Sequence, residues 1–133
     1  MIGLMALPIT AMALCSVGYP SVEQESKVAV GIVVARAERE QALQEDRDDP
    51  QGVTAYVYTA RIIESARGDM SGVIKIRNDN TSSRFPFELG AEYLLFLHKG
   101  SGEEFWVDSC GNSGPLAERQ ALLARLKEEG TSR

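Results

Sequence analysis

The chain reads as a series of short apolar segments separated by polar turns. Residues 27–37 are dense in valine, residues 53–64 are rich in β-branched and aromatic side chains, and residues 73–77 alternate apolar with basic side chains. Because such residues pack well on a pleated sheet, each segment is predicted to be a strand. Gly31 within the first segment predicts a bulge or a sharp bend.

Polar stretches between these segments predict loops. Residues 38–52 are highly charged and end in Asp-Pro and Gly, so we expect a long exposed loop or hairpin tip. Residues 65–72 are predicted to be the turn that joins the second and third strands as a hairpin. This turn contains Arg67-Gly68-Asp69, a tripeptide known from integrin ligands. Turns favour Gly and Asp for their own geometry, so we assign the tripeptide to turn chemistry.

Two more strands are predicted in the second half of the chain. Residues 93–97 form the most apolar run after residue 20, which is typical of a central strand packed on both faces. Residues 103–110 are expected to form a strand in which Trp106 faces opposite to Phe105 and Val107.

The last segment, residues 115–130, has the periodicity of an amphipathic helix. Pro115 is placed at the first helical position and Gly130 at the end. Its apolar face consists of four leucines: Leu116, Leu122, Leu123 and Leu126. Because the opposite face carries both signs of charge, we expect the leucines to cover a sheet rather than enter a membrane.

These elements predict one domain for the 133 residues, of which 44% are hydrophobic. Five or six strands with hairpin-like links predict a mainly β fold, an OB-type five- or six-stranded barrel with a C-terminal amphipathic α-helix packed on it. A small sandwich is the alternative. The net charge of −5 argues against nucleic acid or anionic lipid as a general partner, since both require clustered Lys and Arg.

The first twenty residues carry no charge. The apolar run over residues 1–14 is too short to cross a bilayer, which needs about 20 residues, but it has the length of a signal-peptide core. The small residues in Ala11-Met12-Ala13 fit a cleavage site that leaves Leu14 or a nearby residue first. No basic residue precedes the run, so an upstream start or a buried strand or helix are alternatives. We predict a signal peptide over 1–14 and an exported domain, periplasmic or secreted, over 15–133.

Cys15 and Cys110 are the only cysteines. In an oxidising compartment they would most economically form one disulfide, worth about 4–5 kcal/mol in the chain-entropy model, whereas in the cytosol they would be two buried thiols. A zinc site is disfavoured because the spacing is not local and His98 is the only histidine. We expect His98 to be a surface residue at a strand end.

No enzymatic or cofactor motif is recognisable in the sequence. A pair of His98 with either cysteine has no identifiable orienting partner. The carboxylates Asp108, Glu92 and Glu88 are spaced along predicted strands, where such residues are usually just exposed. We therefore expect a protein that is not an enzyme and needs no cofactor.

The order of the segments "VAVGIVV", "YTARIIESARGDMSGVIKI", "LGAEYLLFL" and "FWVDSCGNSGPL" resembles the netrin-type or tissue-inhibitor-of-metalloproteinases superfamily in its short bacterial form. The resemblance covers residues 15–126. It implies an OB-type barrel with helices at its side and an N-terminal segment laid across the barrel and fixed by disulfides. On this resemblance, Cys110 anchors the segment that holds Cys15.

The resemblance also implies an exported binding module, either a protease inhibitor or a protein-interaction domain. In the animal inhibitors the mature chain begins with a Cys-x-Cys motif, whose first α-amine and carbonyl chelate the protease zinc. Cys15-Ser16-Val17 lacks the second cysteine, and Leu14 would stand ahead of the first. We therefore expect no zinc-directed inhibition, although a metalloproteinase remains a candidate among unknown protein partners.

The residues expected to contact a partner are Cys15, Ser16, Arg67, Gly68 and Asp69, together with the loops at 38–52 and 65–72, because exposed loops on a rigid barrel commonly carry binding. The alternative is an envelope-associated structural component without inhibitory activity. A lipid anchor at Cys15, as in outer-membrane lipoproteins, would require cleavage directly before it, and Met12-Ala13-Leu14 is a poor signal for that cleavage.

Overall fold

A computed structural model describes residues 15 and 18–131 of the protein. The expected signal peptide lies outside the described residues. Two α-helices, six strands and one 3₁₀ helix occur in the described part in this order: α2 (Val22–Val28), β1 (Gly31–Leu43), β2 (Ala55–Arg67), β3 (Val73–Asp79), β4 (Glu92–Lys99), β5 (Phe105–Val107), β6 (Gly114–Pro115), η1 (Leu116–Glu118) and α3 (Gln120–Thr131).

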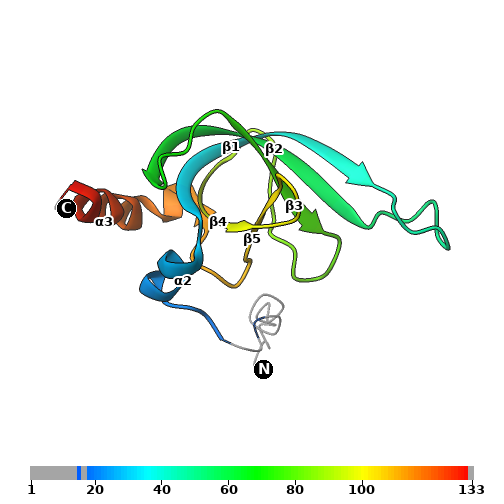
Figure 1. Ribbon diagram of the computed structural model, residues 1–133, viewed down its shortest axis with the longest axis horizontal. Helices are drawn as coiled ribbons and strands as arrows, with labels where there is room; N and C mark the ends of the chain where they lie inside the picture. The colour runs from blue at the N-terminus through cyan, green and yellow to red at the C-terminus, as the bar shows by residue number, and fades with distance from the viewer. Residues whose placement is uncertain (1–14, 16–17, 132–133) are drawn as a thin grey trace, which may run out of the picture.

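The strands form a closed barrel. Neighbouring strands follow the order β1-β2-β3-β5-β4, and β4 pairs with β1 to close the ring (Figure 1). All the pairings are antiparallel except the one between β3 and β5, where Ile76 lies opposite Phe105. The sixth strand, β6, adds to the edge of β4. This is the predicted fold class, a mainly β barrel of the OB type with a C-terminal helix.

The interior of the barrel is filled by alternate side chains of the long strands, as the two-residue period requires. Val33 and Ala35 of β1 and Leu95 and Leu97 of β4 point inward and are fully buried. Aromatic rings close one part of this core, where Phe85, Phe87 and Tyr93 contact one another at centroid distances of 4.6–5.6 Å.

A second apolar layer lies outside the barrel. Ile32 and Val34 of β1 point outward, as do Leu94 and Phe96 of β4, and all four are buried because a helix covers them. The covering residues come from the predicted leucine face: Leu123, Leu126 and, half-buried, Leu116 and Leu122. The prediction of a helix packed on the barrel is confirmed, and β4 is buried on both faces as expected (Figure 1).

The predicted boundaries of the first strand are wrong at both ends. Residues 27–28 belong to α2, and β1 continues through residues 38–43, which the sequence analysis assigned to a loop. The charged residues there are exposed, because the β1–β2 hairpin pairs as far as Leu43 opposite Ala55 and projects past the barrel (Figure 1). Gly31 begins β1 rather than forming a bulge, and the pairing irregularities lie after it.

The predicted start of the terminal helix is also wrong. Pro115 pairs with Tyr93 in β6, and η1 stands between this strand and α3, which begins at Gln120. The missing N–H of Pro115 is tolerated here because proline is compatible with an edge strand.

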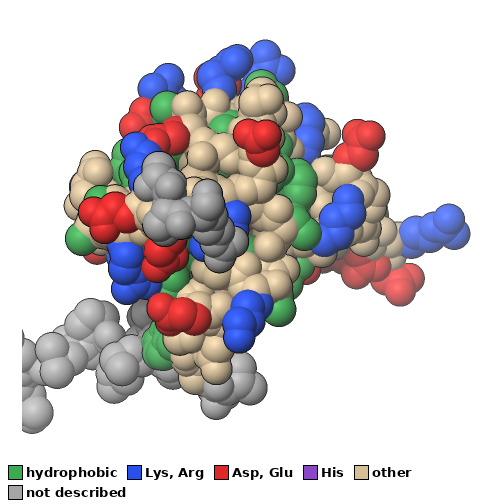
Figure 2. Space-filling view, turned by 60° about the vertical axis from the view of Figure 1, so that its left-hand side comes forward, with side chains coloured by type: hydrophobic (Ala, Val, Ile, Leu, Met, Phe, Trp, Pro, Cys, Tyr) green, Lys and Arg blue, Asp and Glu red, His purple; other side chains and the backbone are tan. Residues whose placement is uncertain are grey.

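The surface on the α3 side carries interspersed charges. Figure 2 turns this side toward the viewer and shows acidic and basic side chains side by side, with no broad area of one sign among the described residues. In the described part of the chain, neither α2 nor α3 has the length and apolar character needed to span a membrane.

Candidate binding surface around Trp106

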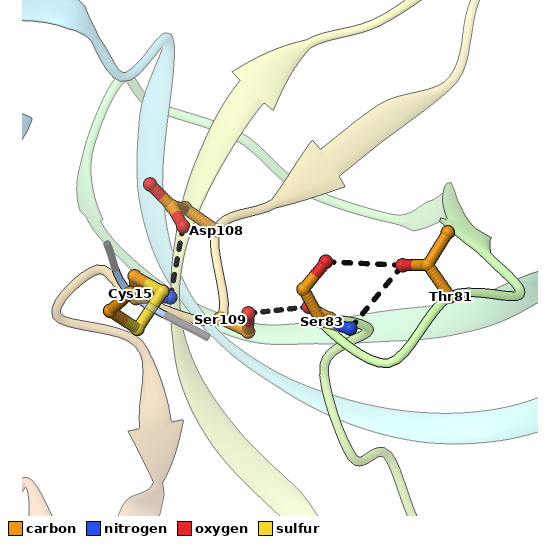
Figure 3. The surroundings of a disulfide bond; sticks show 6 residues. Cys15, Thr81, Ser83, Asp108 and Ser109 are labelled. Carbon is orange, nitrogen blue, oxygen red and sulfur yellow. Dashed lines mark hydrogen bonds between the residues drawn. A yellow bond between two sulfur atoms is a disulfide. The ribbon is translucent and has the colours of Figure 1, made fainter. Parts of the chain in front are cut away.

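Cys15 and Cys110 form a disulfide with a Cα–Cα distance of 5.6 Å. The bond ties the segment before α2 to the loop between β5 and β6. Within this loop, Asp108 accepts a hydrogen bond from the Cys110 N–H at 2.9 Å, and the Ser109 hydroxyl donates to the Ser83 carbonyl of the β3–β4 loop (Figure 3). The disulfide pairing expected for an oxidising compartment is confirmed.

Helix α2 follows this anchored segment. It begins with a capping box, in which the Ser21 hydroxyl accepts from the Gln24 N–H and the Gln24 side chain accepts from the Ser21 N–H. Only one residue of the helix is fully buried, and it is charged: Glu25, with 2% of its surface exposed. Burying a carboxylate requires partners, because desolvation of a charge is costly.

Glu25 finds these partners in two other elements. Its Oε1 accepts hydrogen bonds from the Asn112 backbone N–H at 2.6 Å and from the Asn112 side-chain amide at 3.0 Å, and its Oε2 lies 2.7 Å from His98 Nε2. Burial by itself would raise the pKa of Glu25, but the hydrogen bonds from His98 and Asn112 outweigh burial and lower the pKa below its ordinary value. Glu25 is therefore an anion that joins α2, β4 and the β5–β6 loop.

His98 was predicted to be a surface residue, and this prediction is wrong. The residue is only 8% exposed. Glu25 binds one edge of the ring, and the indole of Trp106 stacks on its face at a centroid distance of 4.5 Å and an interplanar angle of 27°. The strand end is covered because α2, which the sequence analysis did not detect, packs against it.

Trp106 itself remains 43% exposed. It points outward from β5 while its neighbours Phe105 and Val107 face the core, as predicted from their alternation. Two hollows lie beside it, with volumes of about 670 Å³ and about 550 Å³. Both are lined by Trp106, Asp108, Pro20 and Gln24. Because they share these walls, the two hollows form one continuous surface with the indole between them.

The larger hollow lies next to the disulfide and has a polar wall. Two cationic residues, Arg77 and Arg84, line it, and Arg77 is held by Glu45 at 2.7 Å and by Asp79 at 2.9 Å. Hydrogen bonds from Arg77 and Thr54 lower the pKa of Glu45 to about 2. Hydroxyl groups of the β3–β4 loop complete the wall, including those of Thr81 and Ser83.

The smaller hollow lies between α2 and β5. It is lined by Pro20, Gln24, Glu25, Val28, His98, Trp106 and Asp108. Its lining thus combines exposed apolar groups with carboxylates and one imidazole, and contains neither Lys nor Arg.

The structure does not gather the predicted contact residues into one place. Cys15 lines the larger hollow, whereas Ser16 lies outside the described residues. Arg67 ends β2, Gly68 and Asp69 begin the β2–β3 turn, and none of the three lines either hollow beside Trp106. Arg67 pairs with Glu129 of α3 at 3.7 Å.

The turn itself has the geometry that its composition predicts. Gly68 and Asp69 have φ of 92° and 53°, the left-handed region that Gly adopts freely and Asp tolerates. The two loops proposed to contact a partner lie at opposite ends of β2, because Ala55 pairs with Asp79 at one end and Arg61 with Val73 toward the other.

The carboxylates considered for catalysis are dispersed. Glu92 pairs with Arg36 on the barrel surface at 2.8 Å, and Asp108 binds the Cys110 N–H. Over residue 15 and residues 18–131, no group of three His, Cys, Asp or Glu side chains is arranged to hold a metal ion.

The sequence analysis missed Glu25, His98 and Asn112 as a unit. One signal was readable: Ser21 and Gln24 have the spacing of a capping box and predict a helix start. Its Glu25 contacts residues at least 73 positions further along the chain, and no local sequence pattern predicts these contacts. No family model matches the chain, and a search of the curated proteins found no match either.

Proposed function

We propose that the protein is an exported, non-enzymatic binding module, of the kind found in the netrin-type and tissue-inhibitor-of-metalloproteinases superfamily, that contacts a partner protein with the surface around Trp106. The observation that carries the proposal is a half-exposed indole held rigidly between two hollows. Tryptophan is among the residues that most often dominate binding energy at protein interfaces.

The rigidity of this surface supports a binding role. The Cys15–Cys110 bond and the Glu25 hydrogen bonds fix the two segments that border Trp106, and His98 packs under its ring. A surface that is already ordered loses little conformational entropy when a partner binds, so more of the contact energy appears as affinity.

The disulfide is compatible with an oxidising compartment, and this supports export to the periplasm or the exterior. Chelation of a protease zinc by the Cys15 amine is not part of the proposal. It requires Cys15 to begin the mature chain, and the processing site at residues 11–13 predicts Leu14 ahead of it.

Site-specific photo-crosslinking in the producing cells tests the proposal. Tyr19 is 58% exposed and lines the larger hollow, so the photoreactive amino acid benzoylphenylalanine can replace it with little change of shape. Val73, which is 49% exposed and lines neither hollow, is the matched control position. We expect an adduct of discrete mass from position 19, in the exported fraction, and none from position 73. Adducts from position 73 alone, or a protein retained in the cytoplasm, would contradict the proposal.

A further inference from the structure

We infer that the smaller hollow, between α2 and β5, is a subsite for a basic side chain of the partner, best filled by arginine. The inference rests on the proposed function, because it names the chemistry that the Trp106 surface would recognise. It is carried by two groups that line the hollow, the carboxylate of Asp108 and the indole of Trp106, with His98 packed beneath the indole.

His98 lines the hollow and is held from the side of α2. The ionised Glu25 carboxylate can only accept a hydrogen bond, so His98 Nε2 donates to it. No described residue binds Nδ1, although the side chain is only 10% exposed. The ring itself forms part of the wall of the hollow.

Asp108 supplies an acceptor and a negative charge. Its Oδ1 accepts from the Cys110 N–H, and this bond fixes the orientation of the carboxylate. Its Oδ2 receives no hydrogen bond from the described residues and remains available to a ligand. A planar guanidinium, with five N–H donors in a fork, matches the geometry of a carboxylate.

The remaining walls suit the rest of an arginine side chain. One face of the Trp106 indole stacks on His98, which leaves the other side of the ring, in a residue 43% exposed, for a cation. Val28, 66% exposed, and Pro20 offer apolar surface to the methylene stem.

The negative charge of the hollow disfavours anionic and neutral ligands. The lining includes the carboxylates of Glu25 and Asp108 and no Lys or Arg, and the whole chain has a net charge of −5. An anion would be repelled from the hollow, and a neutral amide would leave the Asp108 charge uncompensated.

The test uses the folded, oxidised protein and its own fluorescence, because Trp106 is the only tryptophan. The probe is the blocked tripeptide acetyl-Gly-Arg-Gly-amide, and the neutral control is acetyl-Gly-Gln-Gly-amide. We expect a saturable fluorescence change with the arginine peptide. The glutamine peptide should bind at least about tenfold more weakly, since the charge-assisted hydrogen bonds are lost.

Two matched variants locate the subsite. Asp108→Asn keeps an oxygen for the Cys110 N–H but removes the charge, and we expect it to weaken arginine-peptide binding about tenfold. Asp69→Asn removes a charge in the β2–β3 turn, where Asn tolerates the left-handed conformation, and we expect it to leave binding unchanged.

Equal binding of the two peptides, no saturable change, or equal losses in the two variants would overturn the subsite. None of these results would change the crosslinking result expected at position 19. Failure of the subsite can therefore be distinguished from failure of the binding function.

Discussion

Glu25 of α2 and His98 of β4, 73 residues apart in the chain, form a buried pair in which Oε2 lies 2.7 Å from Nε2. The pair fixes a short N-terminal helix to the central strand of the barrel, directly beneath the exposed indole of Trp106. Asn112 binds the other carboxylate oxygen and brings in the loop that carries Cys110. The proposed binding surface therefore depends on one buried anion.

Removal of this anion should destabilise the fold. We expect Glu25→Ala to lower the free energy of unfolding by about 2–4 kcal/mol, because it leaves the donors of buried His98 and partly buried Asn112 unpaired. The control is Glu23→Ala on the exposed face of α2, for which we expect a change within about 0.5 kcal/mol. Urea unfolding of the oxidised protein measures both. Equal changes in the two variants would show that the Glu25 network contributes nothing.

The same carboxylate predicts a pH dependence. Hydrogen bonds hold the pKa of Glu25 in the folded protein below its ordinary value of 4.5. The resulting stabilisation is complete above the pKa of the unfolded chain and is lost as the pH falls through the folded pKa, because the unfolded chain takes up the proton first. The stability difference between the wild type and Glu25→Gln should therefore shrink below about pH 4.5. A difference that stays constant between about pH 6 and 3 would contradict the lowered pKa.

The disulfide makes a prediction about mass and stability. Intact mass spectrometry after alkylation of the native, unreduced protein should show both cysteines protected, and the same spectrum gives the mature N-terminus. Replacement of both cysteines by serine should cost about 4–5 kcal/mol, since the bond closes a loop of 95 residues. Alkylation of Cys15 and Cys110 without reductant would rule out the anchoring of the N-terminal segment.

The barrel could be predicted because its strands carry their information locally. The alternation around Trp106, the all-apolar run from Tyr93 to Leu97 and the glycine-rich β2–β3 turn each specify an element within a few residues. The predicted strand ends were less accurate. The exposed charged residues at 38–43 resemble a loop in the sequence, and only their pairing with β2 makes them a strand.

The candidate site could not be predicted in the same way. Histidine is a common surface residue, and His98 is buried because Glu25, 73 residues away, binds it and because its cross-strand neighbour Trp106 stacks on its ring. Arg67-Gly68-Asp69 matches a known tripeptide motif, but its residues line neither hollow beside Trp106. Of the predicted contact residues that the structure describes, only Cys15 lines a hollow beside Trp106.

The packing of α3 on the barrel is tested by one substitution on each face. Leu123→Asp should lower stability by several kcal/mol, because Leu123 is buried against β1 and β4 and the new charge has no partner. Ala124→Asp, at the neighbouring exposed position, should cost less than about 1 kcal/mol, the loss in helix propensity. Equal effects of the two substitutions would show that the leucine face is not packed.

The most direct test of the central claim is the affinity of the partner recovered by crosslinking for two matched variants of the oxidised protein. Trp106→Ala removes the exposed indole, and Ile63→Ala removes a similarly exposed apolar side chain of β2, with 43% and 48% of the residues exposed, respectively. We predict that Trp106→Ala weakens binding at least about tenfold, as expected for an interface hot spot, and that Ile63→Ala changes it less than about twofold. Wild-type affinity in folded Trp106→Ala protein would contradict the account.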